Sequence, residues 1–128
     1  MQINSVHTQN ACAPIGPYSQ ATCHAELIYC SGQIGLNSEG ELPSSLEAQA
    51  KQIFENIEAV LVAAGSGVGS ILRCVIYLTN MADFTEVNAL YKDFVKEPYP
   101  ARSTIEVSQL PKGALIEIEV TACKRMFT

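Results

Sequence analysis

The chain has 128 residues, 48% of them hydrophobic, and a formal net charge of −5 at pH 7. That length supports one domain with a substantial core and is short for two, so we expect a single domain over residues 1–128. The eight Lys and Arg residues form no stripe, which disfavours nucleic acid as a partner. No apolar run approaches the roughly 20 residues that span a bilayer, and residues 1–16 lack the basic segment of a secretory signal and the arginines of a transit peptide. We therefore expect a cytoplasmic protein without a membrane partner.

Cysteine and histidine usage favours neither a disulfide framework nor a metal site. The five cysteines are an odd set, contain no C-x-x-C pair and lie mostly in apolar stretches, as reduced, packed thiols do. The two histidines, His7 and His24, have no partner at the spacing of zinc ligands. We therefore predict that the chain holds no metal ion.

A β-hairpin is expected near the N-terminus. Residues 27–34 are rich in strand formers, and residues 18–23 can pair with them across a polar turn. Ser31-Gly32-Gln33 interrupts the second strand with small and polar groups, which indicates either a bulge or a place where a ligand approaches the backbone. Tyr18 follows two prolines that restrict the chain, so it is either an oriented pocket residue or a tyrosine of the core.

A long amphipathic helix is predicted over residues 46–64, where apolar side chains recur at helical spacing. Ser44 and Glu47 have the spacing of a capping box at its start. Gly65 stands where a left-handed residue would close the helix.

Residues 71–78 are apolar at both alternating sets of positions apart from Arg73, which is typical of a central strand covered on both faces. A second helix is predicted from Asp83 to the residues before Pro98. Asn88 lies midway along that helix, and periodicity leaves open whether it is an exposed polar residue or a hydrogen-bonding group aimed at a pocket.

Two further strands, residues 100–107 and 115–120, alternate apolar and polar side chains, and we expect their free faces to carry Arg102 and Glu117. An arginine fork binds a carboxylate through two hydrogen bonds, and a neighbouring glutamate can move a proton or orient a water. The hypothesis that the two side chains share a pocket depends on the register of the final hairpin. On periodicity alone, both remain more typical of surface charges. Glu119 is expected to be structural or solvent-facing.

The element order of two strands, helix, strand, helix and two strands predicts an α+β domain with two helices packed on one face of a mixed sheet. Such a sheet leaves its other face open. Because that face carries apolar residues, we expect the chain to self-associate through it.

Five ordered stretches, taken together, resemble the RidA family, also called YjgF/YER057c/UK114. The resemblance runs from about residue 13 to residue 122. The stretches are residues 13–21, 31–34, 84–91, 100–103 and 110–119.

The resemblance implies a chorismate-mutase-like fold assembled as a homotrimer, with ligand pockets in the clefts between subunits. It also implies hydrolysis of reactive 2-imino acids and their enamine tautomers, such as 2-aminoacrylate (2-iminopropanoate) and 2-iminobutanoate, to 2-oxo acids and ammonia, without a cofactor. In this chain the family's carboxylate-binding arginine matches Arg102, and its carboxylate near the imine matches Glu117. Other pocket positions match Tyr18, Ser31, Gly32 and Asn88.

One position departs from the family pattern. Many relatives carry a cysteine two residues after the arginine, whereas this chain has Thr104. A thiol-based activity at this position is therefore not expected, but a threonine hydroxyl can still hydrogen-bond a ligand, so Thr104 is kept as a substrate-binding candidate.

An alternative is a trimer that binds a 2-oxo acid or a similar metabolite through the same arginine and performs no catalysis. A third possibility within the family is an RNA-directed translation inhibitor. The acidic chain without a basic stripe disfavours it, because phosphate contacts supply most of the affinity for nucleic acid.

Overall fold

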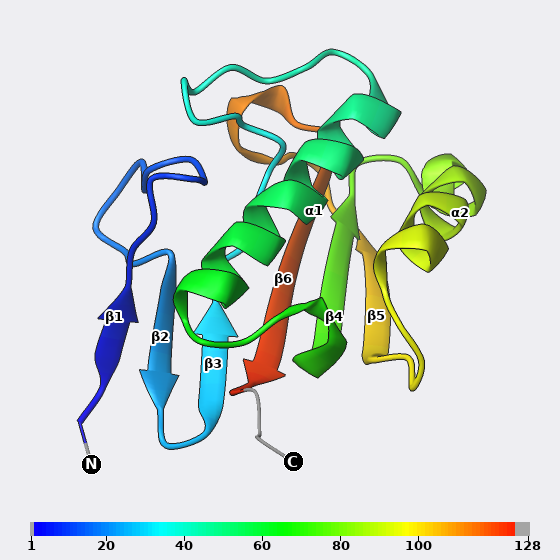
Figure 1. Ribbon diagram of the computed structural model, residues 1–128. Helices are drawn as coiled ribbons and strands as arrows, with labels where there is room; N and C mark the ends of the chain where they lie inside the picture. Colours follow the sequence, from blue (N-terminus) through cyan, green and yellow to red (C-terminus); the bar gives the residue numbers. More distant parts are fainter. Residues whose placement is uncertain (1, 125–128) are drawn as a thin grey trace.

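Six strands form one mixed sheet in the order β1-β2-β3-β6-β4-β5 in the computed structural model, which describes residues 2–124 (Figure 1). The strands are β1 (Asn4–Val6), β2 (Ala21–His24), β3 (Leu27–Cys30), β4 (Ile71–Leu78), β5 (Ala101–Glu106) and β6 (Ile116–Cys123). The α-helices are α1 (Leu46–Ala63) and α2 (Phe84–Phe94), and three short 3₁₀ helices are η1 (Val68–Ser70), η2 (Met81–Asp83) and η3 (Pro111–Gly113). The α+β class and the mixed sheet are therefore confirmed.

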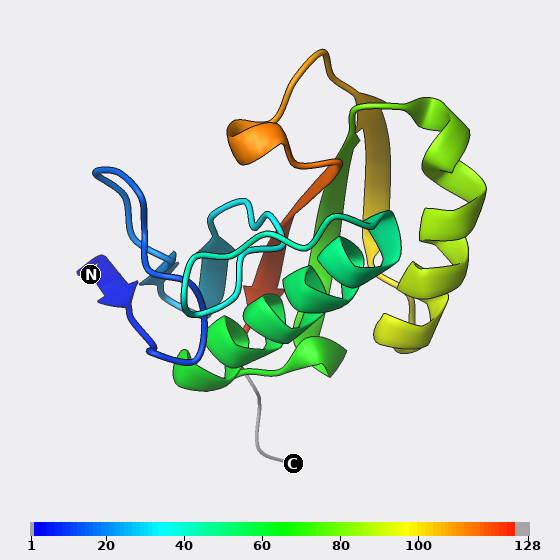
Figure 2. The same cartoon turned by 90° about the horizontal axis from the view of Figure 1, so that it is seen from above.

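Both helices lie on one face of the sheet, as seen from above in Figure 2. The side chains that they cover come from alternating positions of the central strands, and each is at most 3% exposed. In β4 these are Cys74, Ile76 and Leu78, and in β6 they are Ile116, Ile118, Val120 and Ala122. The rings of Phe54 and Phe94 stack with centroids 4.3 Å apart and join α1 to α2.

The last two strands do not form the hairpin that was predicted. β4 lies between them, pairing in parallel with β5 and antiparallel with β6. The parallel pair arises because α2 crosses from the end of β4 back to the start of β5. The segment that contains η3 then returns the chain to the other side of β4, where β6 also pairs with β3.

The N-terminal strands are shorter than the sequence indicates. β3 ends at Cys30 and not at residue 34, although pairing with β6 resumes at Gln33, which exchanges backbone hydrogen bonds of 2.8 and 3.0 Å with Ile118. Ser31 and Gly32 are thus the interruption that the pattern indicated. β1 was not predicted, because its three residues bury only Val6 and show no period.

The C-terminal end of α1 agrees with the prediction, and the N-terminal cap does not. Ser45, one residue later than expected, is the N-cap, and its hydroxyl accepts a hydrogen bond from the backbone N–H of Ala48 at 3.1 Å. The predicted capping box of Ser44 and Glu47 is wrong by this one-residue shift. Gly65 has a φ of +82° and closes the helix in the left-handed conformation.

Cys23, Cys30 and Cys74 are buried, which agrees with their interpretation as packed thiols. Among residues 2–124, no helix combines the length and the apolar character that a membrane crossing requires.

Candidate functional site

Glu117 lies in β6 on the face of the sheet opposite the helices, directly across from Tyr77 of β4. Its carboxyl group rests on the backbone of Gly32, so that a Cβ atom added there would be 2.4 Å from Oε2 and 2.9 Å from Cδ of Glu117. Glycine at position 32 is therefore what allows the carboxyl group to lie there. The two predicted residues meet, although 85 positions separate them in the chain.

Partial burial raises the pKa of Glu117 above its usual range, and the nearby carboxylate of Glu119 raises it further. The hydroxyl of Tyr77 donates a hydrogen bond to Oε1 of Glu119. This bond raises the pKa of Tyr77 to about 12, so the phenol stays protonated and continues to donate. Glu119 is thus part of the electrostatics around Glu117, a role that the sequence analysis did not assign to it.

An open cavity of 350 Å³ lies over this carboxyl group. It is lined by Ile15, Tyr18, Ser31, Gly32, Ile34, Pro111 and Glu117. Four of the predicted site residues, Tyr18, Ser31, Gly32 and Glu117, therefore line one hollow. We call it the glutamate half-site.

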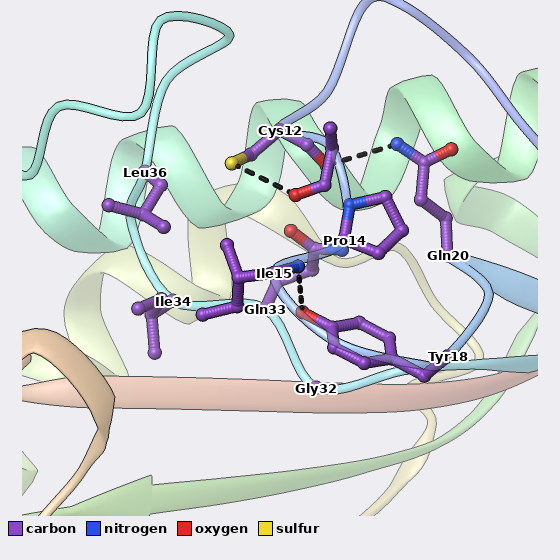
Figure 3. Close-up of a pocket in the computed structure, with 10 residues that line it drawn as sticks. Cys12, Pro14, Ile15, Tyr18, Gln20, Gly32, Gln33, Ile34 and Leu36 are labelled. Carbon is purple, nitrogen blue, oxygen red and sulfur yellow. Dashed lines mark hydrogen bonds between the residues drawn. The ribbon is translucent and has the colours of Figure 1, made fainter.

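The loop before β2 forms one wall of the glutamate half-site, and Figure 3 shows how its side chains lie. The hydroxyl of Tyr18 accepts a hydrogen bond from the backbone N–H of Ile15 at 3.2 Å, while its side chain remains exposed. The hydroxyl of Ser31 donates to the carbonyl of Ser19 at 2.6 Å, which leaves its oxygen free to accept. The same loop also lines a small cavity of about 30 Å³, which is large enough for one water molecule.

Three buried amides that the sequence analysis missed hold these loops in place. Gln20 donates to the carbonyls of Thr8 and Cys12 at 3.1 Å each and accepts from the N–H of Thr8 at 2.7 Å. Gln49 and Asn56, on the buried side of α1, bind the loops that flank β3 and β6. Gln49 and Asn56 could have been identified from the sequence, because they are polar residues within the apolar stripe of α1.

Arg102 lies at the start of β5, in register with the buried Cys74 of β4, and its side chain is on the face that the helices cover. Its Nη1 atom donates to Oδ1 of Asn88 in α2 at 2.7 Å. Its Cζ atom is 4.9 Å from the ring centroid of Tyr91 and 5.6 Å from that of Phe84. Among residues 2–124, no carboxylate lies within 4.0 Å of this guanidinium.

An open cavity of 560 Å³ adjoins the arginine. It is lined by Tyr91, Lys92, Val95, Tyr99, Pro100 and Arg102. We call it the arginine half-site.

Arg102 and Glu117 are not on a shared face of the sheet, and the prediction that both lie on free faces is wrong for Arg102. Arg102 is in register with Cys74, and Glu117 with Tyr77, three residues further along β4. An odd separation along a strand reverses the side-chain direction, so the two half-sites open on opposite faces. One chain therefore does not bring the cation and the carboxyl group into one pocket.

Thr104 shares the helix-covered face with Arg102, because its partner in β4 is the buried Ile76. Its Oγ1 atom is buried and has no hydrogen-bond partner among residues 2–124. Within the same range, no three His, Cys, Asp or Glu side chains come close enough together to hold a metal ion.

Comparison with known proteins gives matches over nearly the whole chain. A family model described as Endoribonuclease L-PSP matches residues 8–124. The 2-iminobutanoate/2-iminopropanoate deaminase of Escherichia coli K12 is 42% identical over 125 residues, which are 94% of this chain and 98% of that protein.

Solved structures agree with this match. RidA from the Antarctic bacterium Psychrobacter sp. superposes with a TM-score of 0.92 at 39% identity, covering 94% of this chain and 98% of that one. E. coli TdcF with bound serine superposes with a TM-score of 0.90 at 36% identity, covering 95% and 99%. Each of these three matches covers at least 94% of this chain.

Proposed function

Because the chain belongs to the RidA (YjgF/YER057c/UK114) family, we propose that it hydrolyses reactive 2-imino acids and their enamine tautomers to 2-oxo acids and ammonia. The substrates are small, such as 2-aminoacrylate (2-iminopropanoate) and 2-iminobutanoate. The name of the E. coli relative supports this substrate class. The observation that carries the proposal is the carboxyl group of Glu117, which is seated on Gly32 in an open cavity and has a raised pKa.

We propose that the complete site forms between subunits of a homotrimer. The glutamate half-site and the arginine half-site are different surfaces, so joining one to the other requires a head-to-tail contact between copies of the chain. Such contacts form a ring when the rotation between copies closes, and the family resemblance favours a closed ring of three subunits. The open sheet face also carries exposed apolar side chains that a neighbour would bury, namely Leu27, Tyr29 and Ile105, which are 36%, 49% and 44% exposed.

In the proposed reaction, Arg102 of one subunit holds the carboxylate of the substrate by two parallel hydrogen bonds. The ionised Glu117 of the next subunit accepts a proton from a water molecule, whose oxygen bonds to the carbon of the protonated imine to give a neutral carbinolamine. Protonated Glu117 then gives this proton to the amino nitrogen of the carbinolamine. The C–N bond breaks and ammonia leaves, and the hydroxyl proton passes to the Glu117 carboxylate and from there to solvent, which leaves the 2-oxo acid. A carboxyl group with a raised pKa suits these transfers near neutral pH. The chemistry uses no metal or organic cofactor.

The deciding experiment generates 2-aminoacrylate or 2-iminobutanoate enzymatically and measures the release of 2-oxo acid with and without this protein. The wild-type chain should accelerate release, Arg102→Ala should abolish the acceleration while remaining folded, and Glu117→Gln tests the proton transfer separately. Unchanged turnover in Arg102→Ala would contradict the assignment of the arginine.

The alternative of a non-catalytic metabolite-binding trimer uses the same cation, and turnover separates the two functions. If the protein binds a 2-oxo acid but does not accelerate the formation of 2-oxo acid from the imine, its function is binding and not catalysis. We further propose that the protein acts in the cytoplasm, where thiols such as the buried Cys74 stay reduced.

A further inference from the structure

Arg102 is held by one stripe of α2, and this stripe contains no charged group. We propose that Phe84, Asn88 and Tyr91 form a charge-neutral clamp that positions the guanidinium of Arg102, and that Asn88 acts on the arginine instead of on the ligand. The identity of the bound carboxylate rests on the proposed function. The clamp itself consists of the contacts that Arg102 makes within one chain.

The three clamp residues follow one face of the helix. They are spaced by four and three positions, so their side chains lie above one another along α2. Asn88 accepts a hydrogen bond from Nη1 at 2.7 Å, and the two rings lie 4.9 and 5.6 Å from Cζ. A guanidinium held by one hydrogen bond and two ring contacts loses most of its rotational freedom before a ligand arrives, which reduces the cost of binding.

The clamp orients the charge without cancelling it. An arginine has five N–H donors, and Asn88 uses one of them. Because Arg102 also lines the arginine half-site, its other donors can meet a ligand there. An aspartate at position 88 would form an ion pair with the same guanidinium and compete with the carboxylate of the ligand.

The nearby groups that could become anions are also kept neutral. Tyr91 is only 7% exposed, and burial raises the pKa of its hydroxyl well above the usual value. Burial likewise raises the pKa of the Cys74 thiol, which lies opposite Arg102 in the sheet. Tyr91 contacts Arg102 through its ring face, whose centroid is 4.9 Å from Cζ, so the ring is the part of this side chain that serves the clamp.

The test is Asn88→Asp, which preserves the shape of the side chain and adds a charge. We expect the dissociation constant for 2-oxobutanoate, measured by calorimetry, and KM for the imine to rise at least about tenfold, with kcat changed less than about threefold. Asn80→Asp is the matched control, because Asn80 is exposed, caps η2 by accepting from Ala82, and lies outside both half-sites. Equal affinity in Asn88→Asp and the wild type would overturn the clamp.

A second pair of variants separates the ring from the hydroxyl. Tyr91→Leu removes the ring face and should weaken 2-oxobutanoate binding about tenfold, since a partly desolvated cation–π contact is worth that much. Tyr91→Phe restores the ring and should recover most of the affinity. Equal losses in both variants would contradict the role of the ring.

Chemical labelling of Arg102 tests the clamp without any substrate. If the chain neither bound nor turned over these compounds, only the proposed function would be refuted, and the labelling would still test the clamp. Phenylglyoxal modifies the neutral form of arginine, and peptide mass spectrometry separates Arg102 from Arg73. An aspartate at position 88 would stabilise the guanidinium cation, so Asn88→Asp should slow the labelling of Arg102 several-fold. Arg73, which is exposed and binds the hydroxyl of Ser103 at 3.1 Å, should react as in the wild type. Unchanged labelling of Arg102 would refute the neutral clamp.

Discussion

Gly32→Ala places a methyl group where the carboxyl group of Glu117 lies. The added Cβ would be 2.4 Å from Oε2, whereas ordinary contacts begin at 3.4 Å, so the carboxyl oxygen must move by about 1 Å. Displacing a catalytic group by that distance costs about 100-fold in rate. The moving atoms are the end of a flexible side chain, so we expect the free energy of unfolding to stay within about 1 kcal/mol of the wild type.

The assay measures kcat for the release of 2-oxo acid together with urea unfolding. Gly69→Ala is the matched control, because a Cβ atom there meets nothing within 4 Å, and we expect its kcat to equal that of the wild type. If Gly32→Ala kept the wild-type kcat, the position of the Glu117 carboxyl group on residue 32 would not matter for the reaction, and the reasoning from this contact would be refuted.

Three further predictions concern packing and protonation. Gly35→Ala puts a Cβ atom 2.7 Å from the backbone Cα and O of Gln49, which cannot move as a side-chain end can, so urea denaturation should show a loss of about 1–3 kcal/mol. Glu119→Gln removes a negative charge that raises the pKa of Glu117, so the acid limb of the pH profile of kcat/KM should shift to lower pH. Glu117 binds its proton more tightly in the folded chain than in the unfolded one, because its pKa is raised on folding. Its contribution to the free energy of unfolding is therefore complete below the unfolded pKa of about 4.3 and is lost as the pH rises through the raised folded pKa. Glu117→Gln should therefore have a higher Tm than the wild type above that range and an equal or lower one below it.

The helices and most strands could be predicted because their signals are local. The apolar spacing of residues 46–64 predicts a helix without reference to the rest of the chain. Gly65 marks the end of this helix because glycine, which has no Cβ atom, adopts the left-handed conformation without a steric penalty. The short strand β1 has no such signal, since pairing with β2 defines it. The one-residue shift of the N-cap from Ser44 to Ser45 arises because both serines meet the same local preference.

The candidate site could be predicted as a set of residues but not as an arrangement. The motifs identified Arg102, Asn88, Glu117 and Gly32. Asn88 was left open between solvent and a pocket, and only the packing of α2 on β5 directs it to the guanidinium. The buried amide of Gln20 was missed, because a polar residue beside a strand does not show whether hydrogen bonds will compensate its burial.

By itself, the sequence determined the family, the two α-helices, most of the strands and the candidate site residues. Only the tertiary structure decided that Arg102 and Glu117 open on opposite faces of one sheet. The physical reason is that alternation along a strand determines only which side chains of that strand share a face. Whether side chains of two different strands share a face depends on the order and register of the strands. Because β4 lies between β5 and β6, the two side chains belong to separate half-sites, which in the proposed function meet through a second copy of the chain.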